Sequence, residues 1–393
     1  MRFKVTIGAF ACVLAACQTA GVQQVPPVPA DAAAPQISAR ACEQRVNDTL
    51  TKIEQCIDRR SLWLRLAHFQ KIADANRGPH GHGNRDTGTP GYRASVAYVA
   101  AVMRQAGYHV TIQRYVYTGS DASPRSRGRR GPLAIDRRWR SAIRERPGSD
   151  IDYNVIADSP FGDPHNTVVI DAHLDSIYGA GMLDNASGST TILEVALAMA
   201  KTHTLNRLRY IWFGGEELGL LGSQYYTTHL SSSALHDIDF DVDVDVTATP
   251  NFDILIADPE NSFEAKRFPP NVIPESTVGN DYFADFFERG GVVARAARFG
   301  NDGTDSLSFS IAGVPNTGVL TQQDCCKRSW ETKLWGGFLG DYEGTVPGVN
   351  GGCVDRPHRF CDNLSNNDPF VFELVSRSVA YATFGLANRR FAW

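Results

Sequence analysis

The sequence lacks an excess of positive charge, has no visible internal repeat and contains few cysteines. Its formal net charge is −4 and its pI is about 6.2, so a global electrostatic attraction to nucleic acid is not expected. The 393 residues are 42% hydrophobic, which allows one large domain or two smaller ones with a sizeable core.

The scarce cysteines indicate a small set of disulfides in an oxidising compartment. Cys353 and Cys361 bracket a short loop and are the easiest pair to close. Cys42 and Cys56 could not bridge within one straight helix, because 14 residues span about 21 Å and a disulfide joins Cα atoms less than about 7 Å apart. Cys42 and Cys56 therefore need a break in the helix near Asn47, or other partners. A vicinal bond between the adjacent Cys325 and Cys326 is possible but unusual. Outside the N-terminal segment the cysteines are Cys42, Cys56, Cys325, Cys326, Cys353 and Cys361.

The N-terminus has the pattern of an export signal, which we assign to residues 1–16. Arg2 and Lys4 precede an apolar stretch that is too short to span a membrane. The run Leu14-Ala15-Ala16-Cys17 resembles the lipobox of bacterial lipoproteins, in which the cysteine is acylated. An ordinary cleaved signal with an incidental cysteine is the alternative. Gln18 follows rather than an aspartate, which favours the outer membrane, and the proline-containing residues 17–40 are expected to form a flexible tether.

Hydrophobic periodicity predicts strands that alternate with helices through the rest of the chain. This alternation indicates an α/β fold with a mostly parallel, mixed central sheet and helices on both faces. The expected helices span residues 41–75, 92–106, 190–202 and 218–230, and the expected strands lie at 109–117, 167–173, 208–213 and 239–246.

Residues 123–148 carry nine arginines with few acidic residues. In an exported protein, this composition favours a solvated insertion, near residues 118–150, or a contact with anionic lipid. A nucleic-acid patch is the less favoured alternative, and we expect no nucleic-acid partner.

Charged side chains follow two of the predicted buried strands. His173 and Asp175 end the first strand, Asp184 lies on the loop after it, and Glu216 and Glu217 follow the second. Charges at the ends of buried strands are costly unless they are compensated, and a metal ion is a common compensation. In an open α/β sheet, ligands also bind at the carboxyl ends of the strands. The spacing therefore predicts a metal site.

These residue types suit two metal ions. Two ions held about 3.5–4 Å apart are best served by a bridging carboxylate, for which Asp184 is well placed. Asp175 is better used to orient the imidazole of His173. Of the adjacent glutamates, one can bind metal while the other accepts a proton from water. Alone, a Glu-Glu pair more often marks a solvated helix N-terminus.

Four runs of sequence resemble the co-catalytic zinc peptidases of the aminopeptidase Y and bacterial leucyl aminopeptidase type, and the resemblance extends from about Leu62 to the C-terminus. It implies a phosphorylase/hydrolase-like zinc exopeptidase fold for residues 41–393, two zinc ions and peptide substrates. The runs are His173-Leu174-Asp175-Ser176, Asp184-Asn185-Ala186-Ser187-Gly188, the segment from Trp212 to Ser223 that contains Gly214-Gly215-Glu216-Glu217, and Asn84 to Gly91.

The resemblance also implies a role for each site residue. His173 would bind one ion, Asp184 would bridge both, Glu217 would bind the other ion, and Glu216 would be the general base. Asp245 would be the fourth ligand. The competing candidates are Asp239, Asp241 and Asp243, which would otherwise form a solvated strand face.

The fifth ligand implied is a histidine near the C-terminus, and His358 is the one histidine after Asp245. The expected Cys353–Cys361 disulfide would hold its loop rigid. Two positions depart from the family pattern: Pro357 replaces a frequent tyrosine, and Ser306 replaces a frequent histidine. His80 and His82 are expected to be surface residues.

The sequence thus predicts an exported, lipid-anchored, dinuclear zinc aminopeptidase of the bacterial cell envelope. A carboxypeptidase would use a cationic side chain near the site to bind the substrate carboxylate. A glutaminyl-cyclase-like transferase would use a single zinc ion, and a binding protein on this fold would be expected to have lost ligands. The sequence gives no indication of oligomeric state.

Overall fold

The computed structural model describes residues 39–117, 151–260, 269–296, 304–323, 325–343, 352–355 and 359–391. The predicted signal, residues 17–38 of the predicted tether, the arginine-rich segment and His358 lie outside these residues. Ala39 and Arg40, which were predicted to belong to the tether, begin a helix.

The described chain is built on an eight-stranded sheet with the strand order β1-β2-β4-β3-β5-β8-β6-β7. Its centre is parallel, because β3 pairs in parallel with β4 and β5, and β5 with β8. Antiparallel pairing occurs toward the two edges. The predicted mixed, mostly parallel sheet is therefore confirmed. The strands are β1 His109–Val116, β2 Ile151–Asp158, β3 Asp163–His173, β4 Asn206–Phe213, β5 Ile238–Val244, β6 Leu255–Ile256, β7 Arg295–Ala296 and β8 Asn316–Leu320.

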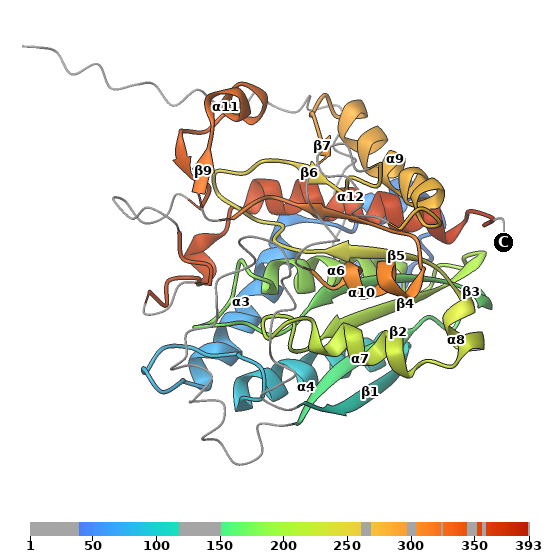
Figure 1. Ribbon diagram of the computed structural model, residues 1–393, viewed down its shortest axis with the longest axis horizontal. Helices are drawn as coiled ribbons and strands as arrows, with labels where there is room; N and C mark the ends of the chain where they lie inside the picture. Colours follow the sequence, from blue (N-terminus) through green and yellow to red (C-terminus); the bar gives the residue numbers. More distant parts are fainter. Residues whose placement is uncertain are drawn as a thin grey trace, which may run out of the picture.

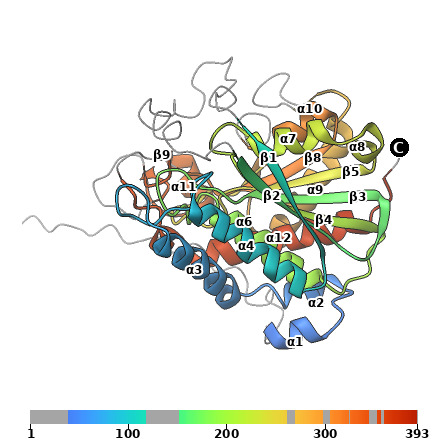
Figure 2. The ribbon, with the colours of Figure 1, turned by 90° about the horizontal axis from the view of Figure 1, so that it is seen from below.

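Helices cover both faces of this sheet, as predicted. Figure 2 shows α7, α8 and α10 on one side of the strands and α3, α4, α6 and α12 on the other. The two faces bury separate apolar clusters, of which the cluster beneath α6 and α12 is much the larger. The covering helices are α3 Arg59–Ala75, α4 Pro90–Gln105, α6 Ala186–Met199, α7 Leu221–His229, α8 Ser232–His236, α9 Ile273–Arg289, α10 Ser306–Ala312 and α12 Pro369–Ala387.

The N-terminal helical region consists of three helices rather than one. Thr49 caps α2 (Leu50–Glu54) and Asp58 caps α3, each by accepting hydrogen bonds from backbone N–H groups of the first turn. The break after α1 (Ala39–Gln44) brings the Cα atoms of Cys42 and Cys56 to 5.6 Å, and the two residues form a disulfide.

Among the described helices, α12 has the length and hydropathy of a membrane span, and 61% of its most apolar stretch is buried inside the protein. It contacts α6 and α9 and lies along the sheet (Figure 1). This packing is typical of a core helix. A smaller unit carries α11 (Ser329–Trp335) beside the two-stranded sheet of β9 (Cys325–Lys327) and β10 (Gly340–Asp341).

Candidate metal centre

The central parallel strands end at the same edge of the sheet. In the register of β3 and β4, His173 lies opposite Phe213, and in the register of β3 and β5, Asp171 lies opposite Asp243. The loops that follow these strands therefore meet at one place. They carry the predicted site residues Asp175, Asp184, Glu216, Glu217 and Asp245.

The first cluster of potential ligands surrounds the imidazole of His173, which is buried. Its Nε2 atom lies 2.9 Å from Oδ1 of Asp184, 3.5 Å from Oδ1 of Asp245 and 4.0 Å from Oε2 of Glu216. Each of His173, Asp184 and Asp245 offers one ligand atom, and these three atoms lie within 4.8 Å of one another. An imidazole with two carboxylates is a donor set that suits zinc.

The second cluster contains carboxylates. Oxygen atoms of Asp184, Glu217 and Asp355 lie within 4.8 Å of one another. Asp184 thus belongs to both clusters, which is the position that a bridging ligand requires. His358, the predicted fifth ligand, lies outside the described residues, and Asp355 was not predicted from the sequence.

The carboxylate of Asp175 is buried and has several partners. It lies 3.5 Å from Nδ1 of His173 and accepts a hydrogen bond of 2.7 Å from Oγ1 of Thr87. It also accepts hydrogen bonds from the backbone N–H groups of Glu216 and Glu217, at 3.2 and 3.4 Å. Asp175 therefore holds the two glutamates as well as the imidazole, whereas the sequence predicted only the contact with the imidazole.

Arg85 is a buried cation that was not predicted from the sequence. Its guanidinium donates hydrogen bonds of 2.7–2.8 Å to the backbone carbonyls of Leu174, Ala180 and Gly181, on both sides of the loop between β3 and Asp184. Burial lowers the pKa of Arg85 to about 10, against the attraction of nearby carboxylates that include Asp362 and Asp175. The family-like run from Asn84 to Gly91 was the available signal for this residue.

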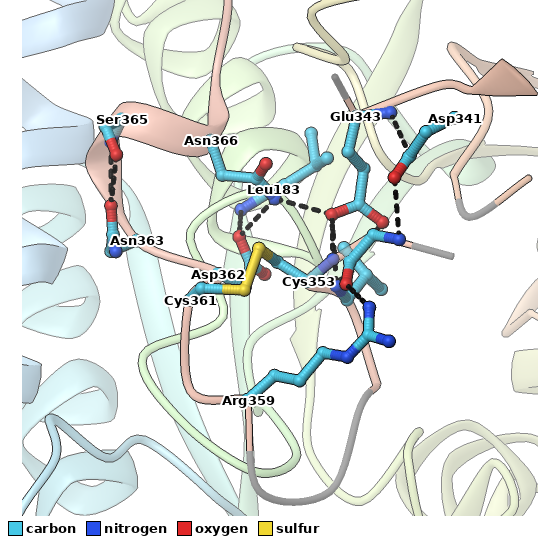
Figure 3. The surroundings of a disulfide bond; sticks show 12 residues. Leu183, Asp341, Glu343, Cys353, Arg359, Cys361, Asp362, Asn363, Ser365 and Asn366 are labelled. Atoms are coloured by element: carbon cyan, nitrogen blue, oxygen red, sulfur yellow. Dashed lines mark hydrogen bonds between the residues drawn. A yellow bond between two sulfur atoms is a disulfide. The ribbon is translucent and has the colours of Figure 1, made fainter. Parts of the chain in front are cut away.

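Two side chains fix the backbone around Asp184. Asn185 accepts hydrogen bonds from Gly188 N–H, at the start of α6, and from Val246 N–H, and so joins this loop to the end of β5. The carboxylate of Asp362 accepts hydrogen bonds from the N–H groups of Leu183 and Asp184, at 2.8 and 3.1 Å. Figure 3 shows Asp362 beside the disulfide of the preceding residue, Cys361, with its carboxylate directed toward Leu183.

Several carboxylates of the site are buried close together, and this raises their pKa values. Burial raises the pKa of Asp184 to about 6, with a further contribution from Asp245. Burial also raises the pKa of Glu216, where His173 partly opposes it, and of Glu217, where Asp355 adds to it. Burial disfavours protonation of His173, yet the surrounding carboxylates, Glu216 first, raise its pKa well above the usual range.

The residues present fit bound cations. Buried Oε1 of Glu217 and Oδ1 of Asp245 accept no hydrogen bond from any described residue. Buried polar atoms are rarely left in this state, and a metal ion would satisfy both.

The acidic face of β5 is buried, so the prediction of a solvated face for these competing residues was wrong. Asp239, Asp241 and Asp243 are each at most 1% exposed and lie on the side of the sheet that α7 and α10 cover. Asp243 accepts hydrogen bonds from Thr304 Oγ1 and Ser306 N–H, and burial raises its pKa to about 6. Among the β5 aspartates, Asp245 is the one grouped with His173 and Asp184.

The six cysteines form three disulfides, and one of them is the unusual vicinal bond. The predicted Cys353–Cys361 bond is present, and the other pairs are Cys42–Cys56 and the vicinal Cys325–Cys326. His80 and His82 are exposed, as predicted. Both rings lie against Phe360 in the disulfide-closed loop.

The chain is similar in sequence to known proteins. The chain is 30% identical over 326 residues to Leupeptin-inactivating enzyme 1 of Streptomyces exfoliatus, which covers 81% of this chain and 60% of that protein. It is 34% identical over 238 residues to the Probable lipoprotein aminopeptidase LpqL of Mycobacterium tuberculosis. This match covers 58% of this chain and 44% of that protein. The chain therefore spans less than two thirds of the length of these relatives.

The fold is also shared with a solved structure. The zinc aminopeptidase BSAP from Bacillus subtilis is similar with a TM-score of 0.58 at 16% identity, over 85% of this chain and 96% of that one. The family model described as Peptidase family M28 matches residues 154–382. This segment is more than half of the sequence and includes the strand-end residues from His173 to Asp245. The chain therefore belongs to peptidase family M28.

Proposed function

We propose that this protein is an exported metallo-aminopeptidase with two zinc ions. The observation that carries the proposal is the pair of ligand clusters that share Asp184. His173, Asp184 and Asp245 would hold one ion. Asp184, Glu217 and His358 would hold the other.

Zinc bound there would act as a Lewis acid toward the scissile carbonyl and would lower the pKa of water. Glu216 is suited to accept and donate the proton. Its side chain is 10% exposed, and burial raises its pKa, which makes the carboxylate a better proton acceptor than an exposed one. The hydrogen bond from its backbone N–H to Asp175 fixes its position. Glu216 would accept the proton of the attacking water and pass it to the leaving amine.

An aminopeptidase is favoured over a carboxypeptidase by the charge of the site. A carboxypeptidase would be expected to use a cation for the substrate carboxylate, and the guanidinium of Arg85 is already bonded to three backbone carbonyls. The carboxylates around His173 would instead attract the α-ammonium group of a peptide. The names of several relatives contain the word aminopeptidase.

The proposed location is the bacterial cell envelope, with a lipid on Cys17 as the anchor to the outer membrane. The lipobox-like run before Cys17 supports this proposal. One relative is named a probable lipoprotein aminopeptidase.

The variant Glu216→Gln tests the role of the proposed base. We expect the purified variant to keep its zinc and to lose peptide hydrolysis by about 10²- to 10⁴-fold, because a glutamine cannot accept the proton. Glu288→Gln, which changes an exposed glutamate on α9, is the matched control and should behave as wild type. Undiminished turnover of Glu216→Gln would contradict the assignment. Parallel assays with free and N-blocked peptides distinguish removal of N-terminal residues from cleavage at the other end.

A further inference from the structure

The loop closed by the Cys353–Cys361 disulfide places a second carboxylate beside Glu217. We propose that Asp355 is a ligand of the metal ion held by Asp184 and Glu217, and that it makes this site richer in oxygen donors than the site of His173. The inference rests on the proposed two-metal function and deepens it. No role for Asp355 is implied by the family resemblance.

Geometry is the first support. One carboxylate oxygen of each of Asp184, Glu217 and Asp355 lie within 4.8 Å of one another. Oxygen ligands bind divalent ions at about 2.0–2.6 Å, so ligand atoms on opposite sides of one ion are about 4–5 Å apart. The three oxygens therefore have the spacing of a single coordination sphere.

Hydrogen bonds to a buried side chain hold the backbone that precedes Asp355. The buried carboxylate of Glu343 accepts hydrogen bonds from the N–H groups of Cys353 and Val354, and Asn366 donates to the same carboxylate. Figure 3 shows Glu343 and Asn366 on one side of the loop with the Cys353–Cys361 disulfide beside them. Asp355 is thus the first residue beyond an anchored segment.

The backbone conformation of Asp355 also suits a short polar side chain. Its φ is +50°, in the left-handed region that Asp and Asn occupy more readily than other residues with a side chain. Replacement of Asp355 by asparagine should therefore keep the backbone in place while it removes the charge.

A cation would join these carboxylates. Buried Oε1 of Glu217 accepts no hydrogen bond from any described residue, and Asp355 supplies one of the carboxylate oxygens grouped with Glu217. A divalent cation between the three carboxylates would offset their mutual repulsion and satisfy this oxygen atom.

The two sites would then differ in donor chemistry. The first has the imidazole nitrogen of His173 with two carboxylates. The second would have carboxylates from Asp184, Glu217 and Asp355. Imidazole favours zinc, whereas carboxylate oxygens also suit harder ions such as Mn²⁺.

Calorimetric titration of the metal-free full-length protein with zinc tests the inference. We expect two binding events for wild type. In Asp355→Asn one event should be unchanged and the other weakened about tenfold or more, since even the loss of an outer-shell partner costs that much. Asp281→Asn, which alters an exposed aspartate on α9, should match wild type. Two events of unchanged affinity in Asp355→Asn would overturn the ligand role alone, whereas fewer than two events in wild type would overturn the two-metal function as well.

Thermal unfolding separates a ligand role from a structural one. Zinc should raise the Tm of Asp355→Asn by less than it raises the Tm of wild type, with each increase measured against the same protein in chelator. A lower Tm in chelator together with a full zinc-induced increase would mean that Asp355 serves the fold and would overturn the proposal.

Discussion

At the scale of single residues, the site depends on buried polar groups that orient the potential ligands. Asp175 contacts His173, Thr87 and the backbone of both glutamates, and Arg85 holds the intervening loop. The sequence indicated His173, Asp184 and the glutamates because short motifs carry them. The family-like run from Asn84 to Gly91 marked the segment of Arg85 but not its role, and no motif marked Asp355, because the contacts of both residues join segments far apart in the chain.

The substitution Asp175→Asn should weaken the site without unfolding it. Asparagine keeps one oxygen acceptor but loses the charge that supports the imidazole and one of the acceptors for the glutamate N–H groups. We expect zinc affinity and kcat to fall by about 10- to 100-fold, measured by competition with a chelator and by steady-state kinetics.

The matched control is Thr87→Val, which removes one hydrogen bond to the same carboxylate and leaves its charge. Its effect should be smaller. Equal effects of the two variants would show that the charge of Asp175 is unimportant.

At the scale of elements, periodicity predicted the main strands and helices but not their surroundings. Leu62, Leu66, Phe69 and Ala73 of α3 are buried on one face, as their spacing indicated. The alternation of acids in β5 predicted a solvated face, yet these aspartates are buried and α10 packs against β5, because the partners of a strand face are set by tertiary packing. The positions of helix ends shifted for a similar reason: α7 begins at Leu221, after the turn that carries the glutamates.

The two disulfides between non-adjacent cysteines should have separable effects. Cys42–Cys56 closes a loop of 14 residues in α1 and α2, which contact α6 and α12 rather than the loops after the strands. Replacement of both cysteines by serine should lower the free energy of unfolding by about 3 kcal/mol and leave kcat near the wild-type value. The same double replacement of Cys353 and Cys361 should reduce zinc affinity at one site, because this bond closes the loop that carries Asp355 and His358.

Urea unfolding and zinc titration of the two double variants provide the comparison. The role given to the disulfide-closed loop would be contradicted if Cys353→Ser/Cys361→Ser bound zinc at both sites with wild-type affinity. It would also be contradicted if Cys42→Ser/Cys56→Ser bound zinc more weakly at one site.

At the scale of the whole molecule, the stability of the fold is tied to the protonation of its buried carboxylates. Burial raises the pKa of Asp184 and Asp243 from 3.8 to about 6, and that of Asp362 to about 7. The folded, metal-free protein therefore binds these protons more tightly than the unfolded chain does. The stability that these groups contribute is fully present below pH 3.8 and is lost as the pH rises through about 6 to 7.

We therefore expect metal-free protein to unfold more easily at pH 8 than at pH 5, because a tenfold difference in proton affinity between the folded and unfolded chain corresponds to about 1.4 kcal/mol. Zinc should act in the opposite sense, because its ligands must lose their protons, so its stabilising effect should be larger at pH 8. Urea unfolding at both pH values, with chelator and with zinc, measures this. A metal-free protein that is more stable at pH 8 would show that the buried carboxylates are stabilised in their charged form.

The central claim is that the carboxyl ends of the central strands hold two metal ions that share Asp184. Elemental analysis of the purified full-length protein, as zinc atoms per chain, tests it most directly. The account predicts two zinc atoms per chain in wild type and in Glu216→Gln. A saturating content of one zinc per chain, as in a single-zinc cyclase-like site, would contradict it.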